Sequence, residues 1–419
     1  MTNKMQAVII AAGESSRFWP LNQGHKCQTC LLGKSLIYWT TKGLFENGVQ
    51  DITVVCGVGS TIPEMLQREN DIGVSLRFVF QEKPLGTGNA LWQAREFIKE
   101  PFFVVWPNKI NSKELIAKMM EQKNAKGSDA VFAGAETLSP WDYGVAEFKG
   151  EQLVGIHENP EQGKEPSKIK IIGCYFFEPD FFDYYSKLSQ HHEADFIEAV
   201  NLYLKNKKAS VALLEKDAPA LKYPWELLGI FDILLSSENF GHSISLSAQI
   251  GNNVTIKGQV HIGSNTKIQD NTVIEGPCFI GDNCVIGHSN VLRGPLNIEN
   301  NVITGAFCEI KHSVVGEGCH IHSGFIGDSV IGKNCRIAAG FISANRRLDR
   351  GEINVVVKDK KINTGLTYLG VVIGENTGIG IHSGTMPGVL IGSNCVIGPG
   401  TQIFKNVPDG QRVFSKGSP

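Results

Sequence analysis

The most constraining feature of the sequence is an aliphatic residue at every sixth position of its second half. From Ile244 this register runs unbroken to Ile298, with one leucine at Leu292, and it returns between Ile373 and Ile403. Glycine often follows the aliphatic residue, as in the IG pairs. A six-residue period with one inward aliphatic per repeat predicts a parallel β-helix, in which each short strand places one branched side chain inside a prism.

The repeat is interrupted between about residues 299 and 372. Insertions such as NRRLDRGEINVVVKDKKINTG depart from the six-residue register there. Interruptions of a regular scaffold are places where function concentrates. We therefore expect the coils to carry a site and not to serve only as a spacer.

The first half has a different organisation. Short apolar runs, among them AVIIAAG, DITVVCG, LRFVFQ and FFVVW, alternate with helix-like stretches such as TGNALWQAREFIKE. This alternation predicts an α/β domain with a mostly parallel sheet and helices on both faces. We expect two domains, residues 1–235 and 236–419, joined by a helix over residues 224–241.

Composition narrows the function classes. The 40 basic and 42 acidic residues nearly balance, which argues against a nucleic-acid or anionic-membrane partner, and no apolar run is long enough to span a bilayer. Ten scattered cysteines suit reduced thiols in a cytoplasmic protein. The CxxC pair Cys27 and Cys30 lacks nearby ligands for zinc, so packing is the favoured interpretation, with redox or metal use as the alternative.

Two glycine-containing segments are candidate nucleotide contacts. Gly13 to Arg17, after the first expected strand, offers backbone N–H groups and a guanidinium to a phosphate chain, and Lys26 could add a second cation. Gly86-Thr87-Gly88 permits close backbone approach to a ring or phosphate. Each could equally be an ordinary turn before a helix.

Together, these segments resemble the sugar-1-phosphate nucleotidylyltransferases. Over essentially the whole chain the resemblance is to the bifunctional N-acetylglucosamine-1-phosphate uridylyltransferase/glucosamine-1-phosphate acetyltransferase family. That family joins a Rossmann-like nucleotidyltransferase domain to a left-handed parallel β-helix of hexapeptide repeats. The residues that match its motifs in the first half are Ala11-Ala12-Gly13, Arg17, Lys26, Gln81, Leu85-Gly86-Thr87, Tyr143-Gly144, Glu158 and Gly173.

The resemblance implies attack of a sugar phosphate on the α-phosphate of a nucleoside triphosphate, with release of pyrophosphate. Arg17 and Lys26 would be catalytic by neutralising developing charge, and Mg²⁺ would bridge the phosphates. The implied substrate contacts are Gly13 for phosphate, Gln81, Gly86 and Thr87 for the base, and Tyr143, Gly144 and Glu158 around the sugar.

The chain departs from the family pattern at ligand-facing positions. The metal-binding aspartate falls on Asn108, between Pro107 and Lys109, which is a poor site for a cation that prefers carboxylates. Glu226 is the other candidate metal ligand. The remaining departures are Ser15, His25, Asn159, Ile171 and Phe231. Because they cluster while the strands stay intact, we expect nucleotidylyl transfer to be weakened or lost.

The second half resembles the acetyltransferase motifs of the same family, which implies acetyl-CoA as co-substrate. In GCHIHSGFIGDSVIG, His322 matches the general base, with Phe325 in place of a tyrosine and His320 as the local rival. Arg293, Glu309 and Lys311 match residues near the sugar phosphate. Asn345 in AAGFISANRR matches a further substrate contact, with Arg346 at a tyrosine position.

Three functions therefore compete. The favoured one is acetyl transfer to an amino-sugar 1-phosphate, with a decayed nucleotidylyl site. The second is an active nucleotidylyltransferase that uses Asn108 and Glu226 as metal ligands, and the third is a non-catalytic scaffold that binds nucleotide sugar. By family analogy we expect a homotrimer, with coenzyme A between the coils of adjacent subunits.

Overall fold

The computed structural model describes residues 5–215, 221–237 and 240–415. Its contacts divide the chain into two compact units, which are considered separately. Unit 1 comprises residues 1–14 and 35–218, and unit 2 comprises residues 15–34 and 219–419. The domains 1–235 and 236–419 remain a proposal from the sequence. The contacts between residues differ from it in one respect, because they group segment 15–34 with the C-terminal repeats.

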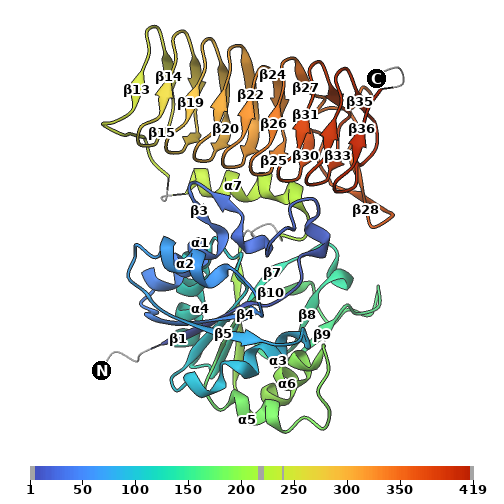
Figure 1. Cartoon of the computed structure of the whole chain (residues 1–419). Coiled ribbons are helices and arrows are strands. Elements are labelled where there is room, and N and C mark those ends of the chain that lie inside the picture. The colour runs from blue at the N-terminus through green and yellow to red at the C-terminus, as the bar shows by residue number, and fades with distance from the viewer. Residues whose placement is uncertain (1–4, 216–220, 238–239, 416–419) are drawn as a thin grey trace. The chain divides into compact units, whose positions relative to one another are not determined.

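Unit 1 is built on a sheet in the order β11-β7-β10-β6-β1-β4-β5 (Figure 1). The pairs β1–β4, β1–β6, β4–β5 and β7–β11 are parallel, whereas β10 is antiparallel to both of its neighbours. The strands of this sheet are β1 Gln6–Ala11, β4 Asp51–Gly57, β5 Ser75–Gln81, β6 Phe102–Val105, β7 Ala130–Glu136, β10 Ile169–Phe177 and β11 Ala209–Leu214. A hairpin of β8 Gly144–Lys149 and β9 Gln152–Glu158 joins the sheet through the pairing of β8 with β10. The predicted mostly parallel sheet is confirmed.

Helices cover both faces of this sheet because both faces are apolar. Consecutive residues of the central strands, such as Ala7, Val8 and Ile9 of β1, are fully buried. One face packs on aromatic residues of α5 Phe181–Ser186 and α6 Asp195–Leu204 together with α3 Gly86–Gln93. The other helices are α1 Leu36–Glu46, α2 Ile62–Glu69 and α4 Ser112–Lys126, with α1 packed on both α2 and α4.

Unit 2 is the left-handed parallel β-helix expected from the repeat. Residues 18 apart pair in parallel, as Ile244 with Ile262 and Ile262 with Ile280, so each coil consists of three six-residue repeats. From Ile262 onward the inward positions form one buried aliphatic column. Ile244 and Ile250, which the register also predicts to point inward, lie in the first coil and are 37% and 41% exposed, because no further coil covers that end. The strands run from β12 Ser243–Ile244 to β36 Arg412–Val413, and the longest are β20 Val291–Ile298 and β22 Cys308–Val315.

The interrupted stretch continues the coil with altered spacing. Cys308 pairs with Gly324, only 16 residues on, and Val330 pairs with Val372 across a long insertion. Part of that insertion forms an antiparallel hairpin of β28 Asn354–Val357 and β29 Lys360–Asn363. The six-residue period fails here because residues are removed from one coil and added to another.

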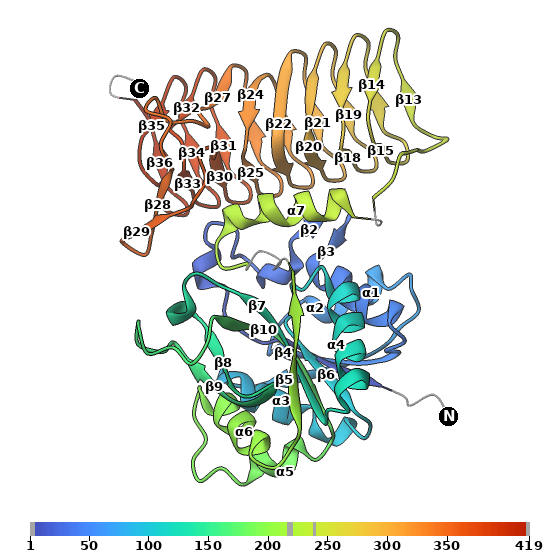
Figure 2. The same ribbon diagram turned by 180° about the vertical axis from the view of Figure 1, so that it is seen from behind.

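Helix α7 Leu227–Ser236 lies along the coils in both views (Figures 1 and 2) and packs on β20 and β22. It lies within the stretch 224–241 that we expected to be helical. Segment 15–34 is also bound to the coils: Trp19 Nε1 donates to Asp409 Oδ1 at 3.1 Å, and Leu32 N donates to Asn297 Oδ1 at 2.8 Å. None of the ten cysteines, all of which lie in the described residues, forms a disulfide.

Candidate functional site

In unit 1, the segment after β5 is tightly constrained. Gln81 Nε2 donates to Gly86 O at 3.1 Å and to Asn89 Oδ1 at 2.9 Å, so the glutamine side chain holds the start of α3. Gly86 has a φ of +89°, and a Cβ there would lie 2.2 Å from Glu193 O. Thr87 follows as a half-buried residue. The structure thus brings the three proposed base contacts together around one helix N-terminus.

The proposed sugar contacts lie together on the β8–β9 hairpin. Gly144 pairs with Glu158, and a Cβ on Gly144 would lie 2.5 Å from Glu158 Oε1. Partial burial raises the pKa of the Glu158 carboxyl. Tyr143 O accepts from Asn159 N at 3.0 Å, and the Tyr143 ring carries the Lys170 ammonium 4.4 Å from its centroid. Asn159 therefore fixes the hairpin end through its backbone, at a φ of 44°.

Asn108 lies in the turn after β6 and is only 7% exposed. Its neighbour Lys109 is also buried, which places a cation next to the proposed metal ligand. Close by in the fold, Gly173 packs on Trp106, with a hypothetical Cβ 3.1 Å from the indole. Ile171 packs at the margin of the aromatic core. Asn108 and Ile171 thus place a buried neutral amide and a half-buried aliphatic side chain where the family resemblance implies an aspartate and a polar residue.

The remaining phosphate-loop residues belong to unit 2. Ser15 Oγ accepts from Lys26 N at 2.9 Å, so the serine that replaces a family glycine ties the loop to the lysine segment. Lys26 Nζ donates to Leu221 O at 2.6 Å. Arg17 is exposed. His25 caps the turn that begins at Lys26, and burial together with the Lys26 charge lowers the pKa of its imidazole to about 4.

The residues proposed as metal ligands do not fit Mg²⁺ well. Glu226 Oε2 accepts from the backbone N–H groups of Lys222 and Tyr223, the latter at 2.7 Å, and burial raises the pKa of its carboxyl. A carboxylate whose oxygen already accepts two backbone hydrogen bonds, and whose burial disfavours the charged form, is a weak ligand for a hard dication. Phe231 is fully buried, and within the described residues no group of three or more His, Cys, Asp or Glu side chains could hold a metal ion.

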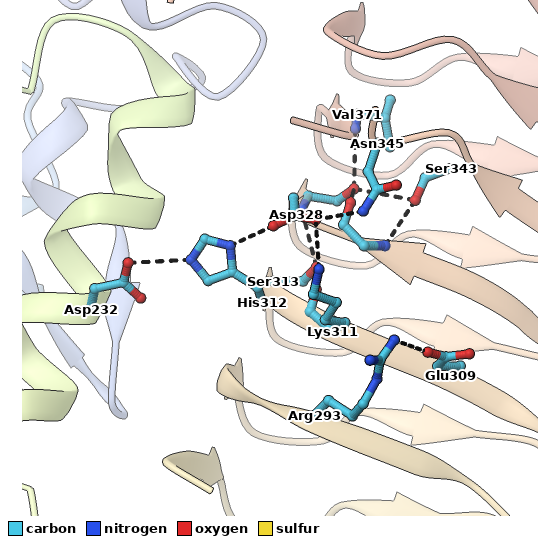
Figure 3. Close-up of polar contacts among 12 residues, drawn as sticks. Asp232, Arg293, Glu309, Lys311, His312, Ser313, Asp328, Ser343, Asn345 and Val371 are labelled. Atoms are coloured by element: carbon cyan, nitrogen blue, oxygen red, sulfur yellow. Dashed lines mark hydrogen bonds and ion pairs between the residues drawn. The ribbon is translucent and has the colours of Figure 1, made fainter. Parts of the chain in front are cut away.

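Four of the five acetyl-site candidates, all except His322, form one polar cluster on consecutive coils (Figure 3). Arg293 and Lys311 are register partners, and the Arg293 guanidinium pairs with Glu309. Asn345 Nδ2 donates to Asp328 Oδ2 at 2.5 Å, and Lys311 Nζ lies 3.7 Å from the same oxygen. Four residues chosen from sequence motifs are thus joined directly or through Asp328.

His312 connects this cluster to helix α7. Its Nδ1 is 2.7 Å from Asp328 Oδ1, and its Nε2 is 3.2 Å from Asp232 Oδ2 (Figure 3). Burial alone would lower the pKa of this imidazole. The hydrogen bonds and charges of Asp232 and Asp328 outweigh that effect and raise the pKa to about 9. At neutral pH His312 is therefore an imidazolium between two carboxylates.

Two cations of the cluster lie against the aromatic ring of Tyr368. The Arg346 guanidinium lies 4.6 Å from the centroid of Tyr368, and Lys311 Nζ lies 4.9 Å from it. Among the described residues, the buried Nε atoms of Arg346 and Arg293 have no hydrogen-bond partner. Cations with unused donors favour an anionic ligand group.

His322 lies at the coil corner three residues before Phe325, whose register partner is Glu309. The side chain is exposed, and in the described part of the chain its imidazole makes no hydrogen bond. With Arg336, Pro399, Phe414 and other residues, it lines a groove of about 450 Å³ on the neighbouring face. His320 lines the same groove, so the geometry leaves both histidines next to it.

Sequence reasoning missed the residues that organise the cluster. Asp328 is the aspartate of the IGD motif, which could have been chosen as a polar position next to an expected strand. Nothing local in the sequence distinguishes His312 from the other histidines of the coils. Its partner Asp232 is 80 residues away in the sequence and on a helix whose packing only the fold defines.

Comparison with known proteins agrees with this architecture. A family model described as nucleotidyl transferase matches residues 6–242, and one described as bacterial transferase hexapeptide (six repeats) matches residues 259–294 and 370–405. A sheet of the first kind followed by coils of the second defines a two-part transferase.

Relatives match over nearly the full length. The bifunctional protein GlmU of Methanococcus maripaludis (strain C7) is 34% identical over 98% of both chains. The bifunctional sugar-1-phosphate nucleotidylyltransferase/acetyltransferase of Sulfurisphaera tokodaii is 32% identical over 97% of this chain and 99% of its own. The chain therefore belongs to the bifunctional sugar-1-phosphate nucleotidylyltransferase/acetyltransferase family, and it is an enzyme of the transferase class. None of the described helices meets the length and hydropathy that a membrane span requires.

Proposed function

We propose that unit 2 transfers the acetyl group of acetyl-CoA to the amine of an amino-sugar 1-phosphate. The carrying observation is the clustering of Arg293, Glu309, Lys311 and Asn345 on consecutive coils, with unused cationic donors beside them. A sugar phosphate supplies the anion that such donors favour. The acetyltransferase names of full-length relatives support the same reaction.

In this proposal His322 is the general base. The unprotonated nitrogen of its imidazole would take the proton of the acceptor amine as the amine attacks the thioester carbonyl. The C–S bond would then break, and the imidazolium would return the proton to the departing coenzyme A thiolate. Arg293 and Lys311 hold the phosphate so that the amine faces the base. The mostly apolar groove that His322 lines has a volume of about 450 Å³, and we assign part of the acyl donor to it.

We further propose that nucleotidylyl transfer in the first half is weakened or lost. Asn108 has no carboxylate and lies next to the buried Lys109. Glu226 has a carboxylate, but it accepts a backbone hydrogen bond from Tyr223. Neither residue is therefore a good ligand for Mg²⁺, and we assign no step to the ion. Binding of a nucleotide or sugar phosphate is retained in this proposal. The unit 1 residues assigned to it are Gly13, Gln81, Gly86, Thr87, Tyr143, Gly144 and Glu158. The cations Arg17 and Lys26 are assigned by the family resemblance alone, and the contacts group them with unit 2.

One pair of assays tests this assignment. Thiol release from acetyl-CoA with glucosamine-1-phosphate should be rapid in the wild type and fall at least about 100-fold in His322→Ala. Loss in His320→Ala and not in His322→Ala would move the base to the rival histidine. Efficient pyrophosphate release from a nucleoside triphosphate and a hexose phosphate with Mg²⁺ would show instead that the first site is active. If neither assay detects activity and a nucleotide sugar raises the melting temperature of the protein, the non-catalytic scaffold function is favoured.

A further inference from the structure

Asp328 is a buried carboxylate at the centre of the acetyl-site cluster. Its side chain is 4% exposed, and both oxygens have polar partners: Oδ1 contacts His312, and Oδ2 contacts Asn345 and Lys311. A buried carboxylate is stable only when its charge is matched, because the loss of its hydration is otherwise uncompensated. Asp328 therefore depends on the cations around it.

Asn345 is oriented by this carboxylate. Since its Nδ2 donates to Asp328 Oδ2, the amide oxygen is directed away and is left to accept a hydrogen bond from a ligand. Lys311 is drawn toward the same oxygen. The direction of both side chains is thus set by the rotamer of Asp328.

His312 is the group that sets this rotamer from the other side. It is the partner of Asp328 Oδ1, at 2.7 Å, and its second nitrogen is held by Asp232 of α7 at 3.2 Å. The Phe231 ring, 5.5 Å from the imidazole, packs beside it. The charged groups that face His312 are therefore Asp232 from the helix and Asp328 from the next coil, with Lys311 beside it on its own strand.

We propose that His312 is a positioning residue for acetyl transfer: clamped between Asp232 and Asp328, it fixes the Asp328 carboxylate that orients Asn345 and Lys311 toward the acceptor. This inference rests on the proposed acetyltransferase function. His312 acts through Asp328 and does not touch the acceptor. Helix α7 takes part because Asp232 supplies one side of the clamp.

The test is His312→Asn, with His382→Asn as the matched control. Both histidines occupy corner positions at positive φ, 41° and 54°, which asparagine tolerates, so backbone strain is the same in each. In His312→Asn we expect the KM for glucosamine-1-phosphate to rise about tenfold, an effect of about 1.4 kcal/mol, with the KM for acetyl-CoA unchanged. His382→Asn should leave both constants as in the wild type.

The pH profile separates positioning from a merely structural role. In the wild type, kcat/KM for the sugar phosphate should fall as His312 loses its proton near pH 9. That alkaline limb should disappear in His312→Asn and move to lower pH in Asp232→Asn, which removes one charge of the clamp. Wild-type activity with an unchanged KM and an unchanged limb in His312→Asn would overturn this inference alone. Absence of acetyl transfer by the wild type would overturn the proposed function along with it.

Discussion

At the scale of single residues, the acetyl cluster has more positive charge than its own carboxylates neutralise. Arg293 pairs with Glu309, and His312 and Lys311 share Asp328, but Arg346 has no acidic partner among the described residues. Its guanidinium rests on Tyr368, and its Nε is buried without an acceptor. An unmatched, partly buried donor costs free energy that a bound anion would recover.

Arg346→Leu should therefore weaken binding of the sugar phosphate without unfolding the protein. We expect the KM for glucosamine-1-phosphate to rise about 10- to 100-fold, the range for loss of a charge-assisted hydrogen bond. Arg347→Leu is the control, because that exposed neighbour pairs with Asp349. Steady-state thiol-release kinetics make the measurement, and equal KM values in the two variants would contradict the role of Arg346.

Two glycines of unit 1 differ in what a side chain would meet. A Cβ at Gly88 would lie 2.2 Å from Asp195 Oδ1 and 2.5 Å from the Tyr185 ring, whereas at Gly13 nothing lies within 4 Å. Gly88→Ala should lower the free energy of unfolding by about 1–3 kcal/mol through overpacking, and denaturant titration measures this loss.

Gly13→Ala should leave the free energy of unfolding unchanged. If the loop still holds phosphates, this variant should bind a nucleoside triphosphate more weakly, and calorimetric titration measures the difference.

At the scale of elements, Glu299 fastens segment 15–34 to the coils. It is 4% exposed, and its Oε1 accepts from Gly33 N at 3.3 Å and from Asn297 Nδ2 at 2.9 Å. Burial raises the pKa of its carboxyl from 4.5 to about 7. Because the folded-state pKa is raised, the stabilising contribution is complete below pH 4.5 and is lost as the pH rises through 7.

Glu299→Gln should remove this pH dependence. The wild type should lose roughly 3 kcal/mol between pH 4.5 and 8, at about 1.4 kcal/mol per pKa unit, from this group alone. The amide keeps an acceptor for Gly33 N but does not ionise, so the variant should be flatter over that interval and more stable than the wild type at pH 8. Melting temperatures at pH 5, 6, 7 and 8 measure the difference, and parallel curves would show that Glu299 is not responsible.

How far the sequence predicts each element depends on whether the signal is local. The register from Ile244 to Ile298 predicts the coil because every six-residue repeat carries an aliphatic residue at the same position. Motif spacing selected Arg293, Lys311 and Asn345, which the fold brings together. The clamp around His312 was beyond prediction, because Asp232 reaches it only through the packing of α7. The attachment of Trp19 to Asp409 likewise joins residues 390 positions apart.

At the scale of the whole molecule, the coils expose large apolar side chains along one of their sheets. Ile342 of β27 Phe341–Ser343 is 56% exposed, and Phe404, next to β35 Gln402–Ile403, is 69% exposed. Strand β27 pairs with β32 and β32 pairs with β35, so the coils that carry Ile342 and Phe404 are separated by one coil of the same sheet. Apolar side chains exposed in this way are typical of an interface, and analogy with hexapeptide-repeat transferases favours association about a threefold axis.

We therefore expect a homotrimer, and light scattering should give three times the 45.8 kDa mass of the chain. The double variant Ile342→Asp/Phe404→Asp should shift the mass toward the monomer, because association would bury two carboxylates without partners. Leu138→Asp is the control: this leucine is 94% exposed and belongs to unit 1, not to the coils. If coenzyme A binds between coils of adjacent subunits, acetyl transfer should fall with the trimer. A monomeric wild type that still transfers acetyl groups would place the whole acyl-donor site on one chain.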